Sequence, residues 1–257
     1  MANKKHDFSA KSSKKAQSPE KINEIICILD GSGSMSSQRE NTISGFNNFL
    51  MKQKEMKQDG VKTLLSVIVF REGSSFSYNN FGQTWSNQYG GLEMDTLYNR
   101  VDISEAPLLQ PGQYKTDNGT PLFDCIGQVL TSSQITVDSD ETKPHSILVV
   151  IFTDGEENTS KTWNKTTVSS LINSKKAQKW NFLFLGADLE NFSDSYGIGL
   201  GAQSIKTTGS LRGYNDAWAC VNNVAYFCNS SVNGTYTDAQ LNASVASFDT
   251  MSKAESK

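Results

Sequence analysis

The chain of 257 residues has few of the residues that build zinc sites and disulfide frameworks. It contains four cysteines and two histidines, and their spacings match no zinc motif. We assign no chemistry to the two histidines, His6 and His145, because they form no cluster in the sequence. We expect all four cysteines to be reduced and mostly buried. These are Cys27, Cys125, Cys220 and Cys228.

The sequence also lacks a long apolar run and an excess of charge. Its longest strongly apolar run, residues 147–152, is far shorter than the roughly 20 residues of a membrane span. The net charge is −3, which gives no global signal for nucleic acid. The basic start is not followed by the apolar stretch of a secretory signal. We therefore expect no binding to nucleic acid or membranes, and a location in the cytoplasm or in a particle assembled there.

Composition divides the chain into three parts. Residues 1–20 are rich in Lys and Ser without an apolar period, which predicts a flexible basic tail; an arm that contacts an acidic surface is the alternative. Residues 21–228 contain the strongly apolar segments and have the length of one α/β domain. Residues 229–257 are predicted to be a polar C-terminal tail with at most one marginal helix.

Apolar runs of strand length alternate with helical patterns. The expected strands are 23–30, 62–70, 145–154, 181–188 and a shorter one near 204–208. The expected helices are 42–56, 120–131, 164–178, 211–228 and a short one at 95–101. An edge strand or hairpin is expected in the aromatic-rich residues 73–90, and a loop at 104–119. This order predicts an α/β fold with a doubly wound, mostly parallel central sheet and helices on both faces.

Two of the expected strands end in an aspartate, Asp30 and Asp154. Ligands of open α/β sheets bind at the carboxyl ends of the strands, so both carboxylates are expected at one crevice. Two uncompensated carboxylates repel each other, and a divalent cation resolves this conflict. After Asp30, the residues Ser32 and Ser34 alternate with glycines, which allow a turn tight enough to aim three oxygens at one point. Such oxygens suit Mg²⁺ or Mn²⁺ rather than zinc or copper.

Three motifs resemble the von Willebrand factor A (VWA) family. DGSGSM at residues 30–35 resembles its D-x-S-x-S motif, NGTPLFD at 118–124 its second loop, and FTDGEEN at 152–158 its third loop. They follow the family's order, and FTDGEEN with the later FLFLGAD resembles intracellular bacterial and phage-type members. The resemblance covers roughly residues 22–225 and is weakest over 71–119.

The resemblance implies a Rossmann-like VWA fold with a metal-ion-dependent adhesion site. It implies Mg²⁺, or alternatively Mn²⁺ or Ca²⁺, as the bound ion. The two departures, Asn118 for a common glycine and Phe123 for a common tyrosine, remove no oxygen ligand. The implied metal ligands are Asp30, Ser32, Ser34, Thr120 and Asp154.

Some of the residues near these motifs also have structural roles open to them. Thr120 followed by proline is a sound helix cap in its own right. Asp124 falls in the first turns of a helix, where it is expected to interact with the helix dipole rather than with a metal. Glu156 and Glu157 are expected to be solvated loop charges.

The resemblance implies a protein-binding module, not an enzyme, in which an acidic side chain of a partner completes the coordination of the metal. The first alternative is a structural component of a larger assembly, such as a particle or a complex with an AAA+ ATPase, in which the metal stabilises the domain. A metal-dependent phosphohydrolase with Asp30 as nucleophile is less well supported. Enzymes of that type carry a second acid two residues later, where this chain has Ser32, and no suitable general acid, base or lysine clamp stands out.

Overall fold

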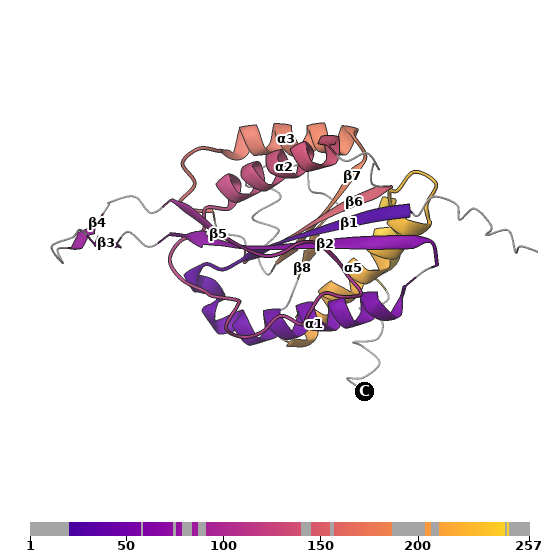
Figure 1. The fold of residues 1–257 in the computed structure, drawn as a ribbon, viewed down its shortest axis with the longest axis horizontal. Helices are drawn as coiled ribbons and strands as arrows, with labels where there is room; N and C mark the ends of the chain where they lie inside the picture. The colour runs from indigo at the N-terminus through magenta and orange to yellow at the C-terminus, as the bar shows by residue number, and fades with distance from the viewer. Residues whose placement is uncertain are drawn as a thin grey trace, which may run out of the picture.

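A computed structural model describes residues 21–57, 59–73, 76–78, 84–86, 91–139, 145–154, 157–186, 204–206, 211–244 and 246. A six-stranded sheet with the order β5-β2-β1-β6-β7-β8 lies at the centre of the domain (Figure 1). Its strands are β1 (Lys21–Asp30), β2 (Val61–Glu72), β5 (Leu92–Asp102), β6 (Ser146–Phe152), β7 (Trp180–Gly186) and β8 (Ser204–Lys206). Neighbouring strands are parallel except for β2 and β5, which are antiparallel.

Helices cover both faces of the sheet, as Figure 1 shows. On one face lie α1 (Arg39–Glu55), which follows the short 3₁₀ helix η1 (Gly33–Gln38), and α5 (Leu211–Ser230); on the other lie α2 (Leu122–Ser139) and α3 (Lys165–Ala177). Because side chains alternate along a strand, β1 supplies both cores. Cys27 and Leu29 belong to the core with α1 and α5, whereas Ile26 and Ile28 belong to the core with α2 and α3. The predicted doubly wound, mostly parallel α/β fold is confirmed.

The short helix predicted at 95–101 is wrong, because these residues belong to the edge strand β5. An edge strand is covered less than a central one, so its sequence lacks a continuous apolar run, and most of β5 is only half-buried. A bulge also interrupts its alternation: the register with β2 shifts around Ser66, and Arg100 adopts a φ of 52°. There the amide of Arg100 donates to the Ser66 hydroxyl over 3.0 Å.

Residues 73–90 contain the predicted hairpin, formed by β3 (Phe76–Tyr78) and β4 (Thr84–Ser86). At its base, the amide of Gly73 donates to the carbonyl of Gly91 over 2.7 Å. We call this hydrogen-bonded pair the neck. The neck lies next to the pair of Glu72 and Leu92, with which the pairing of β2 and β5 ends.

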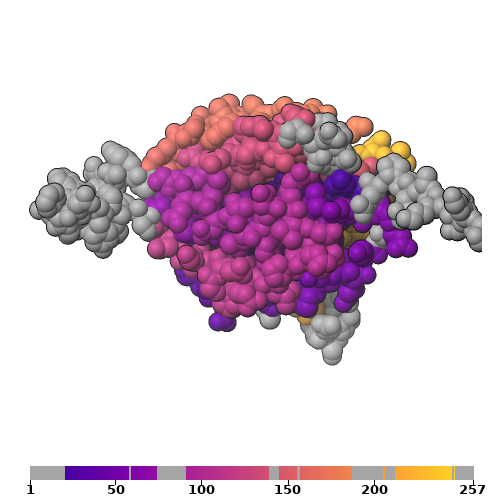
Figure 2. All heavy atoms as spheres, in the orientation of Figure 1, coloured from indigo at the N-terminus to yellow at the C-terminus, as the bar shows by residue number. Residues whose placement is uncertain are grey.

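The expected loop after β5 runs along α1, and we call residues 103–117 the strap. Three side chains of α1 hold the strap by its backbone. Arg39 donates to the carbonyl of Tyr114 over 2.8 Å, Asn47 bonds both polar backbone groups of Leu109, and Lys54 donates to Ala106 over 2.6 Å. The residues drawn in magenta, which come after Gly91 in the chain, form the centre of the face seen in Figure 2. The strap thus leads the chain from the edge of the sheet to the loop before α2.

The beginning of the predicted C-terminal tail packs against the domain. The hydroxyl of Tyr236 donates to the carbonyl of Phe182 over 2.8 Å, and Leu241 is only 1% exposed. Gly234, at a φ of 68°, lies so near His145 that a Cβ would stand 2.0 Å from its carbonyl oxygen. The packed part of the chain therefore continues past residue 228. The predicted basic tail, residues 1–20, lies outside the described residues.

All four cysteines are buried and free, as expected. Burial raises the pKa of the Cys125 thiol well above its ordinary value, which keeps it protonated. In the described part of the chain, no helix combines the length and the apolar character of a membrane span.

Candidate functional site

Three loops meet where β1 and β6 end. The loop after β1 is bonded to the segment before α2: the amide of Gly33 donates to the carbonyl of Asn118 over 2.9 Å. That segment is bonded in turn to the loop after β6, because the amide of Thr120 donates to the Asn158 side chain over 2.8 Å. The structure thus brings together the three loops that carry the five predicted metal ligands.

The first loop arranges its oxygens from the interior to the surface. Asp30 and Ser32 are 0% and 1% exposed, whereas Ser34 is exposed. The Asp30 carboxylate accepts from the amide of Ser32 over 2.8 Å, and the hydroxyl oxygens of Ser32 and Ser34 lie 3.0 Å apart. Gly31 has no room for a side chain, since a Cβ would stand 2.7 Å from the carbonyl oxygen of Lys115. The glycine therefore lets the loop pack directly against the strap.

The second carboxylate, that of Asp154, lies two residues after the end of β6. The pairing of Leu29 with Phe152 places Thr153 beside Asp30, and the Thr153 hydroxyl donates to the Asp30 carboxylate over 2.8 Å. Oδ1 of Asp154 is buried and has no hydrogen-bond partner. A buried carboxylate oxygen without a donor is costly, so this atom is a candidate to bind a ligand.

The environment of Asp30 disfavours its negative charge. Burial raises its pKa from 3.8 to about 6, hydrogen bonds from Ser32 and Thr153 oppose the shift, and the charge of Asp154 adds to it. Two carboxylates thus lie close enough to repel each other in a desolvated position. A cation between them would remove this penalty.

Thr120 does not cap α2, although its sequence allows that role. The amide of Phe123 donates to Glu157 over 2.9 Å, and the amide of Asp124 donates to Ser160 Oγ over 3.0 Å. The third loop therefore caps the helix, while Thr120 is 2% exposed beside Asn158. The expectation that Glu157 is a solvated charge is wrong, because it also accepts from the amide of Ser160. Glu156 lies outside the described residues.

Asp124 is structural, as predicted, but acts on a neighbouring loop. Its buried carboxylate accepts from three consecutive backbone amides, those of Lys161 (2.8 Å), Thr162 (2.9 Å) and Trp163 (2.7 Å). Asp124 and Glu157 thus tie the start of α2 and the third loop to each other. No local pattern predicts these bonds or the contact of Asn158 with Thr120, since they join residues 34 or more positions apart.

The donor set suits a hard divalent cation. The two carboxylates and the hydroxyls of Ser32, Ser34 and Thr120 are all oxygen donors. Among the described residues, no group of three or more His, Cys, Asp or Glu is placed to hold a metal ion, so a cation here would depend on the hydroxyl oxygens as well as on the two carboxylates. The unpartnered Oδ1 of Asp154 is the feature that fits a cation here.

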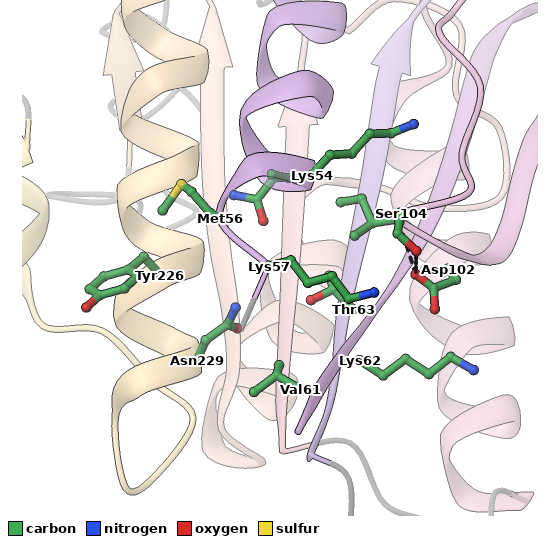
Figure 3. Close-up of a pocket in the computed structure, with 12 residues that line it drawn as sticks. Lys54, Met56, Lys57, Val61, Lys62, Thr63, Asp102, Ser104, Tyr226 and Asn229 are labelled. Atoms are coloured by element: carbon green, nitrogen blue, oxygen red, sulfur yellow. Dashed lines mark hydrogen bonds between the residues drawn. The ribbon is translucent and has the colours of Figure 1, made fainter. Parts of the chain in front are cut away.

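Two cavities of the described chain lie away from the five predicted metal ligands. One of about 60 Å³ lies where β2 begins, beside the ends of α1 and α5, and is lined by Met56, Thr63 and Asn229 (Figure 3). Another, of about 270 Å³, lies between β5 and α2, with the Arg100–Glu24 ion pair (3.1 Å) on its wall. None of the five predicted ligands lines either cavity. Both of these cavities therefore lie away from the candidate site at the strand ends.

Asp30 predicts a pH dependence for the metal-free protein. Because its folded pKa of about 6 exceeds the ordinary 3.8, its contribution to stability is fully present below about pH 4 and is lost as the pH rises through 6. In EDTA, we expect the free energy of unfolding of the wild type, relative to Asp30→Asn, to fall by up to about 3 kcal/mol from about pH 4 to about pH 7. Urea unfolding across this range measures the difference. A difference that does not change with pH would contradict the prediction.

Comparisons with known proteins give only distant likenesses. No family model matches the chain, and no curated protein matches it either. Among solved structures, it is similar to proximal thread matrix protein 1 from the mussel byssus, with 16% identity, 79% of this chain covered and a TM-score of 0.48. It is also similar to the pilus adhesin SpaC from Lactobacillus rhamnosus GG, with 12% identity, 91% covered and a TM-score of 0.46.

A third similar structure is that of the manganese-loaded TRAP protein of Plasmodium vivax, with 14% identity, 68% of this chain covered and a TM-score of 0.42. The chain spans 45%, 30% and 62% of the length of these three proteins, which is less than two thirds of each. Likenesses as distant as these carry no conclusion about ligand, partner or activity.

Proposed function

We propose that this protein is a non-enzymatic, metal-dependent protein-binding module of the VWA type. The observation that carries the proposal is the buried, unpartnered Oδ1 of Asp154 next to the desolvated carboxylate of Asp30. Asp30, Ser32, Ser34, Thr120 and Asp154 would hold Mg²⁺, or Mn²⁺ or Ca²⁺ in its place. The three motifs and their order support this assignment, because their loops are hydrogen-bonded to one another.

The bound cation would supply a positive centre that accepts a carboxylate from a partner. Two of the five donors carry a negative charge, which balances the two charges of the ion, so the site would hold no excess negative charge to repel a partner's carboxylate. Ser34, the exposed member of the set, places the outer side of the site at the surface, where a partner's Asp or Glu can reach it. We further propose that the protein acts in the cytoplasm, or in a particle assembled there, as its resemblance to intracellular bacterial and phage-type members implies.

Metal and carboxylate binding can be tested without knowing the partner. We expect Mn²⁺ to bind the wild type and Asp59→Asn with equal affinity. Asp59 is an exposed carboxylate in the turn before β2, and the start of β2 lies at the end of the sheet opposite Asp30. Asp154→Asn should bind it at least tenfold more weakly, since one charged ligand is lost. Isothermal titration calorimetry gives these affinities. Equal affinity in the wild type and Asp154→Asn would overturn the assigned site.

The second step adds a carboxylate to the Mn²⁺-loaded protein. A peptide with a single Asp should displace water from the metal and change the water-proton relaxation, whereas its Asn analogue should not. Equal responses to both peptides would contradict carboxylate recognition. They would favour the alternative, a structural component of a larger assembly, with or without an AAA+ ATPase, in which the metal only stabilises the domain.

A further inference from the structure

We propose that Tyr114 is a positioning residue for the metal site: its hydroxyl, donated to the main-chain carbonyl of Asp30, holds the first loop in its metal-binding shape. This inference rests on the proposed metal site and adds a residue to it that lies outside the three motifs. Tyr114 belongs to the strap and is 0% exposed. Arg39 of α1 anchors it by donating to its carbonyl over 2.8 Å.

The polar backbone groups of the first loop are bonded one after another, and the strap and the residue after it supply most of the partners. Asp117 donates its amide to the carbonyl of Gly31 over 2.9 Å, and Asn118 accepts from Gly33 over 2.9 Å. The Gly31 amide is bonded to Phe70 of β2 over 2.7 Å. The hydroxyl of Tyr114 donates to the carbonyl of Asp30, which comes directly before these groups in the chain. The peptide groups between the two buried ligands Asp30 and Ser32 are thus fixed from outside the loop.

Tyr114 is the member of this set that acts through a side chain. Its bond can therefore be removed by substitution, whereas the bonds of Asp117, Asn118 and Phe70 are made by backbone groups. A tyrosine hydroxyl carries its proton at neutral pH, and a carbonyl oxygen can only accept, so Tyr114 is the donor of this bond.

The Tyr114 hydrogen bond helps to hold the side-chain oxygens of Asp30 and Ser32 in position. Metal affinity depends on holding ligands close to the coordination geometry, and groups that orient ligands contribute to affinity without touching the metal. Without the Tyr114 hydroxyl, the Asp30 carbonyl loses a buried donor and the peptide that follows is less restrained. Metal binding would then have to fix the loop, which weakens binding.

The test compares Tyr114→Phe with Tyr98→Phe. Tyr98 is a matched control, because it is 4% exposed and its hydroxyl also donates to a carbonyl of the strap, that of Pro107, over 2.8 Å. Both variants keep the ring and lose the hydrogen bond to the strap or the first loop, and Tyr114→Phe also loses the contact of its hydroxyl with Thr42, so both should melt at a lower temperature in EDTA. Calorimetry with Mn²⁺ should show about tenfold weaker binding for Tyr114→Phe and wild-type affinity for Tyr98→Phe.

The outcomes separate this inference from the proposed function. If the wild type binds Mn²⁺ and Tyr114→Phe binds it equally well, Tyr114 is structural only and the inference is overturned while the metal site stands. Equal weakening in both tyrosine variants would also overturn it, since the effect would then reflect general destabilisation. A wild type that binds no Mn²⁺ would refute the metal site and the inference together.

Discussion

Asp30→Asn is expected to make the metal-free protein more stable at neutral pH and to remove its stabilisation by metal. The asparagine oxygen can still accept from the Ser32 amide, and its nitrogen can donate to the Thr153 hydroxyl, so both buried contacts persist. What disappears is a desolvated negative charge near Asp154. We expect a gain of about 1–3 kcal/mol in EDTA.

With metal the order should reverse. A ligand present at about 1,000 times its Kd stabilises the protein that binds it by about 4.1 kcal/mol, which exceeds the gain of the variant and raises the melting temperature by about 8–16 °C for a domain of this size. Asp30→Asn should show no such rise, because the ligand charge is missing. Thermal melts in EDTA and in Mg²⁺ measure both effects. If the variant were less stable than the wild type in EDTA and still responded to Mg²⁺, Asp30 would be a structural residue rather than a metal ligand.

Asp124→Ala is expected to cause the largest loss of stability, about 3–5 kcal/mol. The substitution removes the buried carboxylate that accepts from three consecutive backbone amides, those of residues 161–163, and leaves these amides without their partner. Asp124→Asn keeps one acceptor oxygen and should lose roughly half as much. Urea unfolding in EDTA, with Asp59→Ala as the exposed control, measures these differences. A loss below about 1 kcal/mol for Asp124→Ala would show that the third loop holds its shape by other contacts.

The two effects can be told apart. Asp124→Ala acts on folding, so its loss should be the same size in EDTA and in saturating Mg²⁺ if the remaining folded molecules still bind the metal. Asp30→Asn acts on the metal, so its effect changes sign between the two conditions. If both substitutions changed stability in the same way in EDTA and in Mg²⁺, the loops and the metal site would fold as one unit.

The sequence predicted those parts of the fold whose signal is local. β1 and β6 are largely buried on both faces, so each appears in the sequence as an apolar run, and an aspartate stands at the end of β1 and two residues after β6. The D-x-S-x-S loop is likewise read from adjacent residues. The edge strand β5 was missed because it is only half-buried and a bulge at Arg100 breaks its alternation.

Other features depend on distant partners and leave no pattern in the sequence. Residues 231–244 look polar, yet a few anchors such as Leu241 and Tyr236 bind them to the domain. The cap of α2 comes from Glu157 and Ser160 rather than from the adjacent Thr120. The donor on the Asp30 carbonyl comes from Tyr114, 84 positions along the chain. Only the fold brings such pairs together, so these roles became visible in the structure.

The neck formed by Gly73 and Gly91 marks a place where the length of the chain between β2 and β5 can change. The chain leaves and re-enters the sheet at two hydrogen-bonded residues, so the sheet ends in the same way whatever number of residues lies between them. Doubling the length of a connection costs only about 0.6 kcal/mol of closure entropy. A reporter or an epitope inserted between Gly73 and Gly91 is therefore expected to leave the pairing of β2 with β5 in place. The same junction makes this segment a natural place for related chains to diverge.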